Sequence, residues 1–107
     1  MGTNTIDYEL SLRDLKRHLN IDFDDDDIYL AQLGRSAIST ILRMTRRTTE
    51  ELLAIGNGDF PINLQLAAMQ LAAHWYRVRE TVSSVHQTAV PFGTSLLVKP
   101  FVKLTND

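Results

Sequence analysis

Several absences narrow the possible functions of this 107-residue chain. It has no cysteine, which excludes disulfide bonds and thiolate metal sites. Its formal net charge is only −2, so no large positive field attracts it to nucleic acid or to an anionic membrane surface. Its wholly apolar runs are too short for a transmembrane helix, and its first residues lack the basic and apolar regions of a signal peptide. We therefore expect a soluble intracellular protein without membrane contact.

The remaining composition is that of an ordinary globular domain. Hydrophobic residues make up 44% and charged residues 22% of the chain, and its length fits one domain with its own core. We predict one all-α domain over residues 1–107, a small bundle of four main helices with a short fifth helical turn and an extended C-terminal tail. Residues 1–10 are expected to form a lead-in, residues 11–83 the helical bundle, and residues 84–107 a loop and a docking tail.

Capping patterns predict where the first two helices begin and end. Ser11 is a good N-cap with Asp14 three residues later, and leucines then recur at helical spacing until about Asn20. The second helix is expected to start within residues 24–27, because these consecutive aspartates favour the positive end of a helix dipole. Its apolar periodicity continues to about Arg43.

The next two helices follow from a capping box and a proline. Thr48 and Glu51 form the capping box that opens a short third helix, which Gly56 ends. Pro61 is suited to the first position of a fourth helix. From residue 61 to residue 76 this helix has no formally charged side chain. A helix that is apolar on nearly every side lies in an interior, so either three other helices or a neighbouring subunit must surround it.

The last part of the chain is apolar but has weaker patterns. Residues 83–92 are expected to form a loop, residues 93–95 to cap one short helical turn that Pro100 stops, and residues 101–104 to form a short strand. So apolar a segment is not expected to remain in water. We therefore predict that it docks on its own bundle or on another chain.

Patterns typical of metal and catalytic sites are incomplete. Asp22, Asp24 and Asp26 alternate as in a calcium-binding EF-hand loop, but Asp27 and Leu33 occupy the positions that need glycine and a bidentate glutamate. The histidines lack a second ligand at helical spacing, and no nucleophile elbow or phosphate-binding loop occurs. We expect a helix start rather than a calcium site, no cofactor or metal, and no enzymatic activity.

A small helix-turn-helix DNA-binding regulator is the alternative function. Residues 48–55, a glycine-containing turn and a helix from Pro61 have about the right lengths. Recognition helices need basic or amide side chains on their N-terminal face, whereas this helix offers no cation before Arg77. Arg46 and Arg47, near the end of the second helix, fit either phosphate contacts or a solvated or subunit-facing surface.

Three segments in series carry a resemblance to a known family. They are residues 12–22 with the acidic run 24–27, residues 73–80 at the end of the fourth helix, and residues 90–93, 96–97 and 100–101 in the tail. In their order and spacing, the chain resembles the small head–tail connector (adaptor) proteins of tailed bacteriophages and prophages, a family also described as phage DNA-packaging proteins.

The resemblance implies a structural protein of the phage neck. It implies a homo-oligomeric ring below the portal protein that extends the DNA channel and joins the head to later neck or tail-completion proteins. The implied location is the virion neck, with assembly in the host cytoplasm. A mildly acidic chain suits such a conduit, because the genome must pass through it without sequence-specific binding.

Interface residues rather than catalytic residues are then expected to carry the function. We expect subunit or portal contacts from Trp75, Tyr76, Arg79, Phe92, Leu96, Leu97 and Phe101, and a lumen or subunit surface at Arg46 and Arg47. The alternative is that the aromatic and apolar side chains close the core of their own protomer. For Trp75 the two interpretations have equal weight, because large aromatic side chains serve both purposes.

Overall fold

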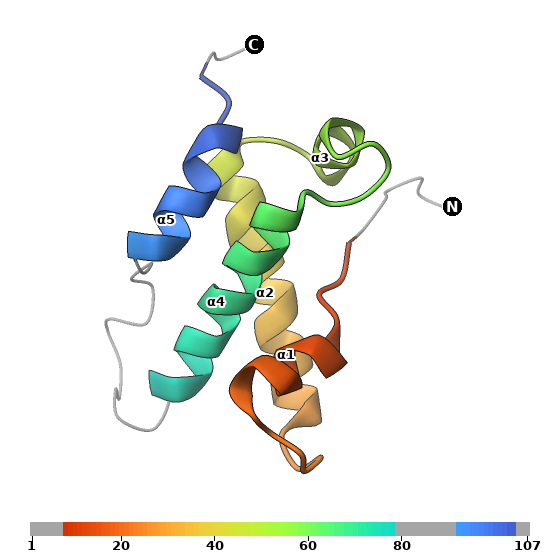
Figure 1. The fold of residues 1–107 in the computed structure, drawn as a ribbon, viewed down its shortest axis with the longest axis vertical. Coiled ribbons are helices and arrows are strands. Elements are labelled where there is room, and N and C mark those ends of the chain that lie inside the picture. The colour runs from red at the N-terminus through yellow and green to blue at the C-terminus, as the bar shows by residue number, and fades with distance from the viewer. Residues whose placement is uncertain (1–7, 79–91, 105–107) are drawn as a thin grey trace.

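The structure is a computed structural model that describes residues 8–78 and 92–104. The described residues form helices and contain no strand, which confirms the predicted all-α class. The elements are α1 (Leu12–Leu19), α2 (Asp27–Thr45), α3 (Thr49–Ile55), α4 (Ile62–Val78), α5 (Phe92–Val98) and a 3₁₀ turn, η1 (Lys99–Phe101) (Figure 1). The lead-in up to residue 7, most of the predicted loop and Arg79 lie outside the described residues.

Side-chain caps fix the starts of α1 and α3 where the sequence predicts them. The Ser11 hydroxyl accepts a hydrogen bond from the backbone N–H of Asp14 at 3.2 Å and caps α1. The chain leaves α1 at Asn20, which adopts the left-handed region at φ 61°. Thr48 and Glu51 form both halves of the capping box that opens α3. These local signals are therefore sufficient to set three of the helix boundaries.

The 19-residue helix α2 ends two residues beyond the predicted Arg43. Arg46 then takes φ 62° and donates its backbone N–H to the carbonyl of Leu42 at 2.9 Å. Thr45 is fully buried, and its hydroxyl donates to the same carbonyl at 3.1 Å. Packing around Thr45 explains the longer helix, because a buried threonine satisfies its hydroxyl most easily on its own helical backbone.

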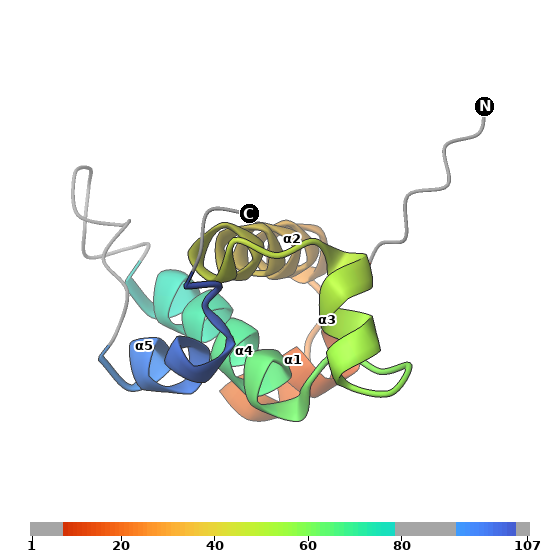
Figure 2. The ribbon, with the colours of Figure 1, turned by 90° about the horizontal axis from the view of Figure 1, so that it is seen from above.

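Helix α4 lies at the centre of the bundle and contacts α1, α2 and α5 (Figure 1, Figure 2). Helices of the same chain thus supply most of the surroundings that its uncharged sequence requires. The side chains that α4 buries are Leu64, Ala67, Ala68, Leu71, Ala72 and Ala73. Ile62 and Leu66 at the start of the helix nevertheless remain 72% and 41% exposed.

The segment before α1 is joined to the turn before α4 by an aromatic pair. The rings of Tyr8 and Phe60 stack with centroids 4.4 Å apart and planes inclined by 9°. Phe60 is only 2% exposed, so the stack belongs to the core. The turn itself begins at Gly56, where a Cβ would overlap the carbonyl oxygen of Asp59. A glycine is therefore required at this position.

The tail is more helical than predicted. Helix α5 is followed directly by η1, which includes Pro100, and residues 102–104 continue without regular structure. The strand predicted for residues 101–104 is therefore wrong. Helix α5 ends at Val98, before Pro100 as predicted, but a 3₁₀ turn continues past this proline, which lies in the first turn of η1, where a missing N–H costs nothing.

Packing on α4 holds this tail in a helical form. Thr94 and Val98 are 0% and 1% exposed, and the Thr94 hydroxyl lies 3.2 Å from Oε1 of Gln70 on α4. Burial against an existing helix stabilises a short segment that would not be helical in water.

None of the helices in the described ranges combines the length and apolar character that a membrane crossing needs.

Candidate functional site

Tyr76, one of the predicted interface residues, makes a strong contact within its own chain. Its hydroxyl donates to Oδ2 of Asp26 at 2.6 Å, and its ring centroid lies 6.2 Å from that of Tyr29. The hydrogen bond links the last turn of α4 to the N-cap residue of α2. Because hydrogen bonds to a carboxylate are stronger than neutral ones, this contact helps to fix how the two helices cross.

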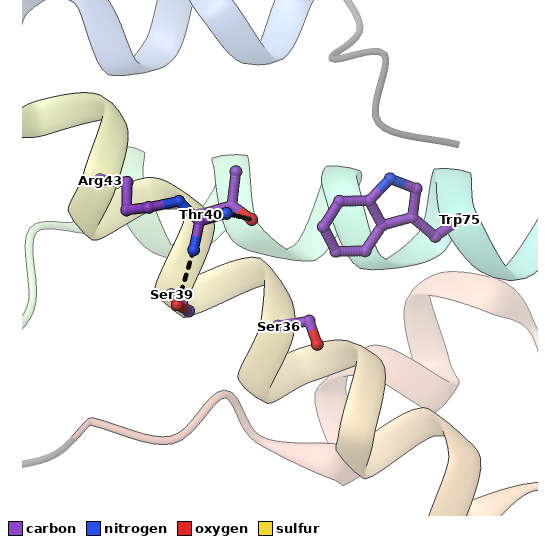
Figure 3. A pocket seen from close by; sticks show the side chains of 5 residues that line it. All are labelled: Ser36, Ser39, Thr40, Arg43 and Trp75. Atoms are coloured by element: carbon purple, nitrogen blue, oxygen red, sulfur yellow. Dashed lines mark hydrogen bonds between the residues drawn. The ribbon is translucent and has the colours of Figure 1, made fainter. Parts of the chain in front are cut away.

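Trp75 is half-buried and forms one wall of a surface pocket of about 310 Å³. The other wall is α2, along which Ser36, Ser39, Thr40 and Arg43 follow one another opposite the indole ring (Figure 3). We call this the Arg43 pocket. The Nε1 atom of Trp75 is shielded from solvent and has no hydrogen-bond acceptor among the described residues, an arrangement that costs about 1–3 kcal/mol.

The Arg43 pocket is rich in hydrogen-bond donors and poor in negative charge. The Arg43 guanidinium donates to Ser39 Oγ at 3.3 Å and to Thr40 Oγ1 at 3.4 Å, which are long contacts to neutral hydroxyls. The described residues that line the pocket include no carboxylate, and the sequence has none from residue 28 to residue 49. Sequence reasoning missed this pocket, although the run without acidic residues could have indicated a surface of α2 that lacks negative charge.

Arg47 and the end of the chain are tied together. The Arg47 Nε donates to the carbonyl of Phe101 at 2.8 Å, and the Lys103 backbone N–H donates to the carbonyl of Thr45 at 2.9 Å. These bonds hold residues 99–103, which we call the C-terminal strap, across the junction of α2 and α3. Arg46, by contrast, is exposed at the end of α2.

Glu51 adds an ionic contact to the C-terminal strap. Its Oε1 accepts the Thr48 backbone N–H at 2.8 Å, and its Oε2 lies 3.3 Å from the Lys103 ammonium. The Thr48 hydrogen bond, and then the Lys103 contact, lower the pKa of Glu51 below its ordinary value. The same carboxylate therefore caps α3 and binds the strap.

The other predicted interface residues in the tail differ in exposure. Leu96 is 53% exposed on α5. Leu97 and Phe101 are half-buried and pack against the protomer's own core. Phe92 is the first residue of α5, and Arg79 lies outside the described residues. Among Leu96, Leu97 and Phe101, Leu96 is therefore the side chain with the most surface to offer a second chain.

The aspartates at the start of α2 form a second charged feature. We call Asp22 and residues 24–27 the acidic corner. The Lys16 ammonium lies 2.7 Å from Asp24 and 2.8 Å from Asp27, and its hydrogen bonds, that to Asp24 first, raise the pKa of Lys16 while the pKa of Asp24 is lowered. Asp22 and Asp25 are exposed and have no ion pair within the described ranges. The described residues contain no group of three or more potential metal ligands.

The start of α4 presents an apolar face rather than a basic one. Ile62 and Leu66 lie one turn apart, so their exposed side chains are neighbours. A recognition helix would carry basic or amide side chains here for base contacts. The exposed residues in this region are two large aliphatic side chains with one amide, Asn63, and no basic side chain. This face is therefore better suited to contact with another protein than with DNA.

The comparison with protein families confirms the resemblance found in the sequence. The model of the family described as phage gp6-like head-tail connector protein matches residues 9–100, which include all of α1 to α5. No curated protein and no solved structure matches the chain. Because the family match spans well over half of the 107 residues, the chain belongs to the phage gp6-like head-tail connector protein family.

Proposed function

We propose that this protein forms a homo-oligomeric ring below the portal protein in the phage neck and joins the head to later neck or tail-completion proteins. The observation that carries the proposal is the family match over residues 9–100. Membership of a head–tail connector family supports a structural role in the neck rather than an enzymatic one. Closed rings arise when each subunit uses two different surfaces to contact its two neighbours.

Exposed apolar side chains support assembly with other chains. Ile62, Leu66 and Leu96 are 72%, 41% and 53% exposed, and burying apolar surface contributes about 25 cal/mol per Å². We assign Leu96 and Trp75 to direct subunit or portal contacts. Tyr76, Leu97 and Phe101 act by positioning α4 and α5, while Arg79 and Phe92 keep the contact role predicted from the sequence.

The charge of the chain supports a channel through which DNA slides. Each phosphate that a protein neutralises adds to its affinity for DNA, so a conduit with many exposed cations would retain the genome. The net charge of −2 avoids this. Arg46 is the exposed cation that we assign to the lumen or to a subunit surface, whereas Arg47 is engaged by the carbonyl of Phe101.

Deleting the coding sequence from the phage that encodes this protein tests the proposed function. We expect DNA-containing heads that lack attached tails, because the neck ring that joins the two is missing. Electron microscopy of lysates measures this outcome, and wild-type protein supplied in trans is the control that restores tailed particles. Tailed, infectious particles produced without the protein would contradict the proposal.

A further inference from the structure

Two features of opposite charge lie at the two ends of α2. The acidic corner contains five carboxylates, of which Asp24 and Asp27 pair with Lys16, and the Arg43 pocket contains a guanidinium with no carboxylate partner among the described residues. Asp27 and Arg43 are sixteen positions apart on one continuous helix, which separates them by about 24 Å at about 1.5 Å per residue. The two features therefore cannot meet within one protomer.

We propose that the acidic corner of one copy, with Asp25 foremost, docks in the Arg43 pocket of a second copy. This inference rests on the proposed ring and names the contact that would build it. A carboxylate can accept two hydrogen bonds from one guanidinium, which makes the pair strong and directional. Within the described part of the chain, the Arg43 guanidinium donates two long hydrogen bonds, to the hydroxyls of Ser39 and Thr40, so it can turn to a better acceptor.

The pocket has the size and the walls that such a contact needs. Its volume of about 310 Å³ can hold an aspartate side chain with part of its backbone. Ser36 and Ser39 also line it and supply further hydroxyl donors, and Trp75 forms the wall opposite α2. An ion pair is stronger where water is partly excluded. Asp25 is available for it, because it is exposed and has no ion pair within the described part of its own chain.

The geometry of the contact is head-to-tail. Each copy uses its acidic corner on one side and its Arg43 pocket on the other, so the interface joins two different surfaces, as a ring requires.

Duplex DNA is another anionic occupant to consider. The net charge of −2 and the acidic corner itself oppose the approach of phosphates, whereas they favour a copy that presents its carboxylates to the pocket.

Charge reversal on a portal template tests the inference. The full-length chain is mixed with its cognate portal, and native mass spectrometry measures the number of copies bound. We expect Arg43→Glu and Asp25→Arg each to reduce binding at least about tenfold, because each leaves like charges facing one another. When the two variants are mixed in one sample and alternate, each corner meets a pocket of opposite charge, so the mixture should bind again. The double variant Arg43→Glu with Asp25→Arg should likewise restore the complete ring.

Controls separate this contact from general effects of charge and folding. Lys99→Glu makes the same change in charge at an exposed residue of η1, outside both the acidic corner and the Arg43 pocket, and should bind like the wild type. Circular dichroism of each variant checks its helical content. If Arg43→Glu does not fold, Arg43→Gln and Asp25→Asn supply a milder test. Each single variant should bind less than the wild type, and the double variant should bind no worse than either, because the ion pair is already lost in each.

Failure of the proposed docking contact and failure of the proposed function give different results in this experiment. If the wild type forms a ring and both charge-reversed variants do so equally well, the inference is wrong and the proposed function stands. If the single variants fail and the double variant does not recover, the inference is also wrong. If the wild type adds nothing to the portal, both are wrong. Salt-sensitive binding of duplex DNA that Arg43→Glu abolishes and Asp25→Arg leaves unchanged would identify DNA as the occupant and overturn the inference.

Discussion

The hydroxyl of Tyr76 lies 2.6 Å from the carboxylate of Asp26 and joins the end of α4 to the start of α2, although 50 residues separate the two in sequence. Replacing Tyr76 by phenylalanine removes this bond and leaves the ring. We expect the free energy of unfolding to fall by about 1.5 kcal/mol, a usual value for a hydrogen bond to a charged group. Urea denaturation followed by circular dichroism measures the change.

Tyr8→Phe is the matched control for this prediction. It keeps the stack on Phe60 and removes a hydroxyl for which the described part of the chain supplies no hydrogen bond. We expect its unfolding midpoint to stay close to that of the wild type. Equal stability of Tyr76→Phe and Tyr8→Phe would contradict the structural role of the contact with Asp26.

Gly56→Ala should destabilise the protein strongly. The added Cβ would overlap the carbonyl oxygen of Asp59, and backbone cannot move aside as a flexible side chain can. We expect a loss of at least about 2 kcal/mol, in the range measured for overpacked interiors. Gly93→Ala is the control, because a Cβ there meets open space and alanine favours the helical conformation of α5. A mild effect of Gly56→Ala would show that this turn differs from the one described.

Removing the Arg47 side chain should loosen the C-terminal strap before it loosens the bundle. Arg47→Met deletes the hydrogen bond to the carbonyl of Phe101. The Lys103 amide, which donates to Thr45, should then exchange its hydrogen about tenfold faster, as expected for the loss of about 1.4 kcal/mol. Hydrogen exchange followed by NMR measures it. Arg46→Met removes the same charge from a neighbouring exposed position and should leave the exchange rate unchanged.

Acidification should weaken the contacts of Glu51. The pKa of Glu51 is lower in the folded than in the unfolded chain. The charged carboxylate therefore contributes its full stabilisation at any pH above its ordinary pKa of about 4.5. That contribution is lost as the pH falls through the lowered pKa of the folded state. Glu51→Gln has no charge to lose, so the difference in melting temperature between wild type and variant should shrink as the pH falls from 7 to 3. A difference that stays constant over this range would contradict the assignment.

Local features of the sequence were enough to predict most of the helical bundle. Ser11, Asn20 and the Thr48–Glu51 pair act on backbone groups within four residues, so their effect can be read without knowing the fold. The uncharged run of α4 likewise indicated a central helix. Such a helix must be buried, whether the helices that cover it belong to the same chain or to another subunit.

The tail and the pocket could not be predicted in the same way. The segment that forms α5 contains glycine, threonine and valine, which favour helices weakly, and it is helical because Thr94 and Val98 pack on α4. The Arg43 pocket depends on Trp75 of α4 lying opposite α2, and the spacing of residues in the sequence does not contain that arrangement. The same is true of the contact between Arg47 and Phe101, which are 54 positions apart.

Electron cryomicroscopy of the purified portal mixed with an excess of this protein is the most direct test of the proposed ring. We expect a closed ring of added density on the portal, in which each subunit fits the arrangement of α1 to α5. A portal map that is unchanged by saturating protein, or density that follows DNA and not the portal, would contradict this proposal.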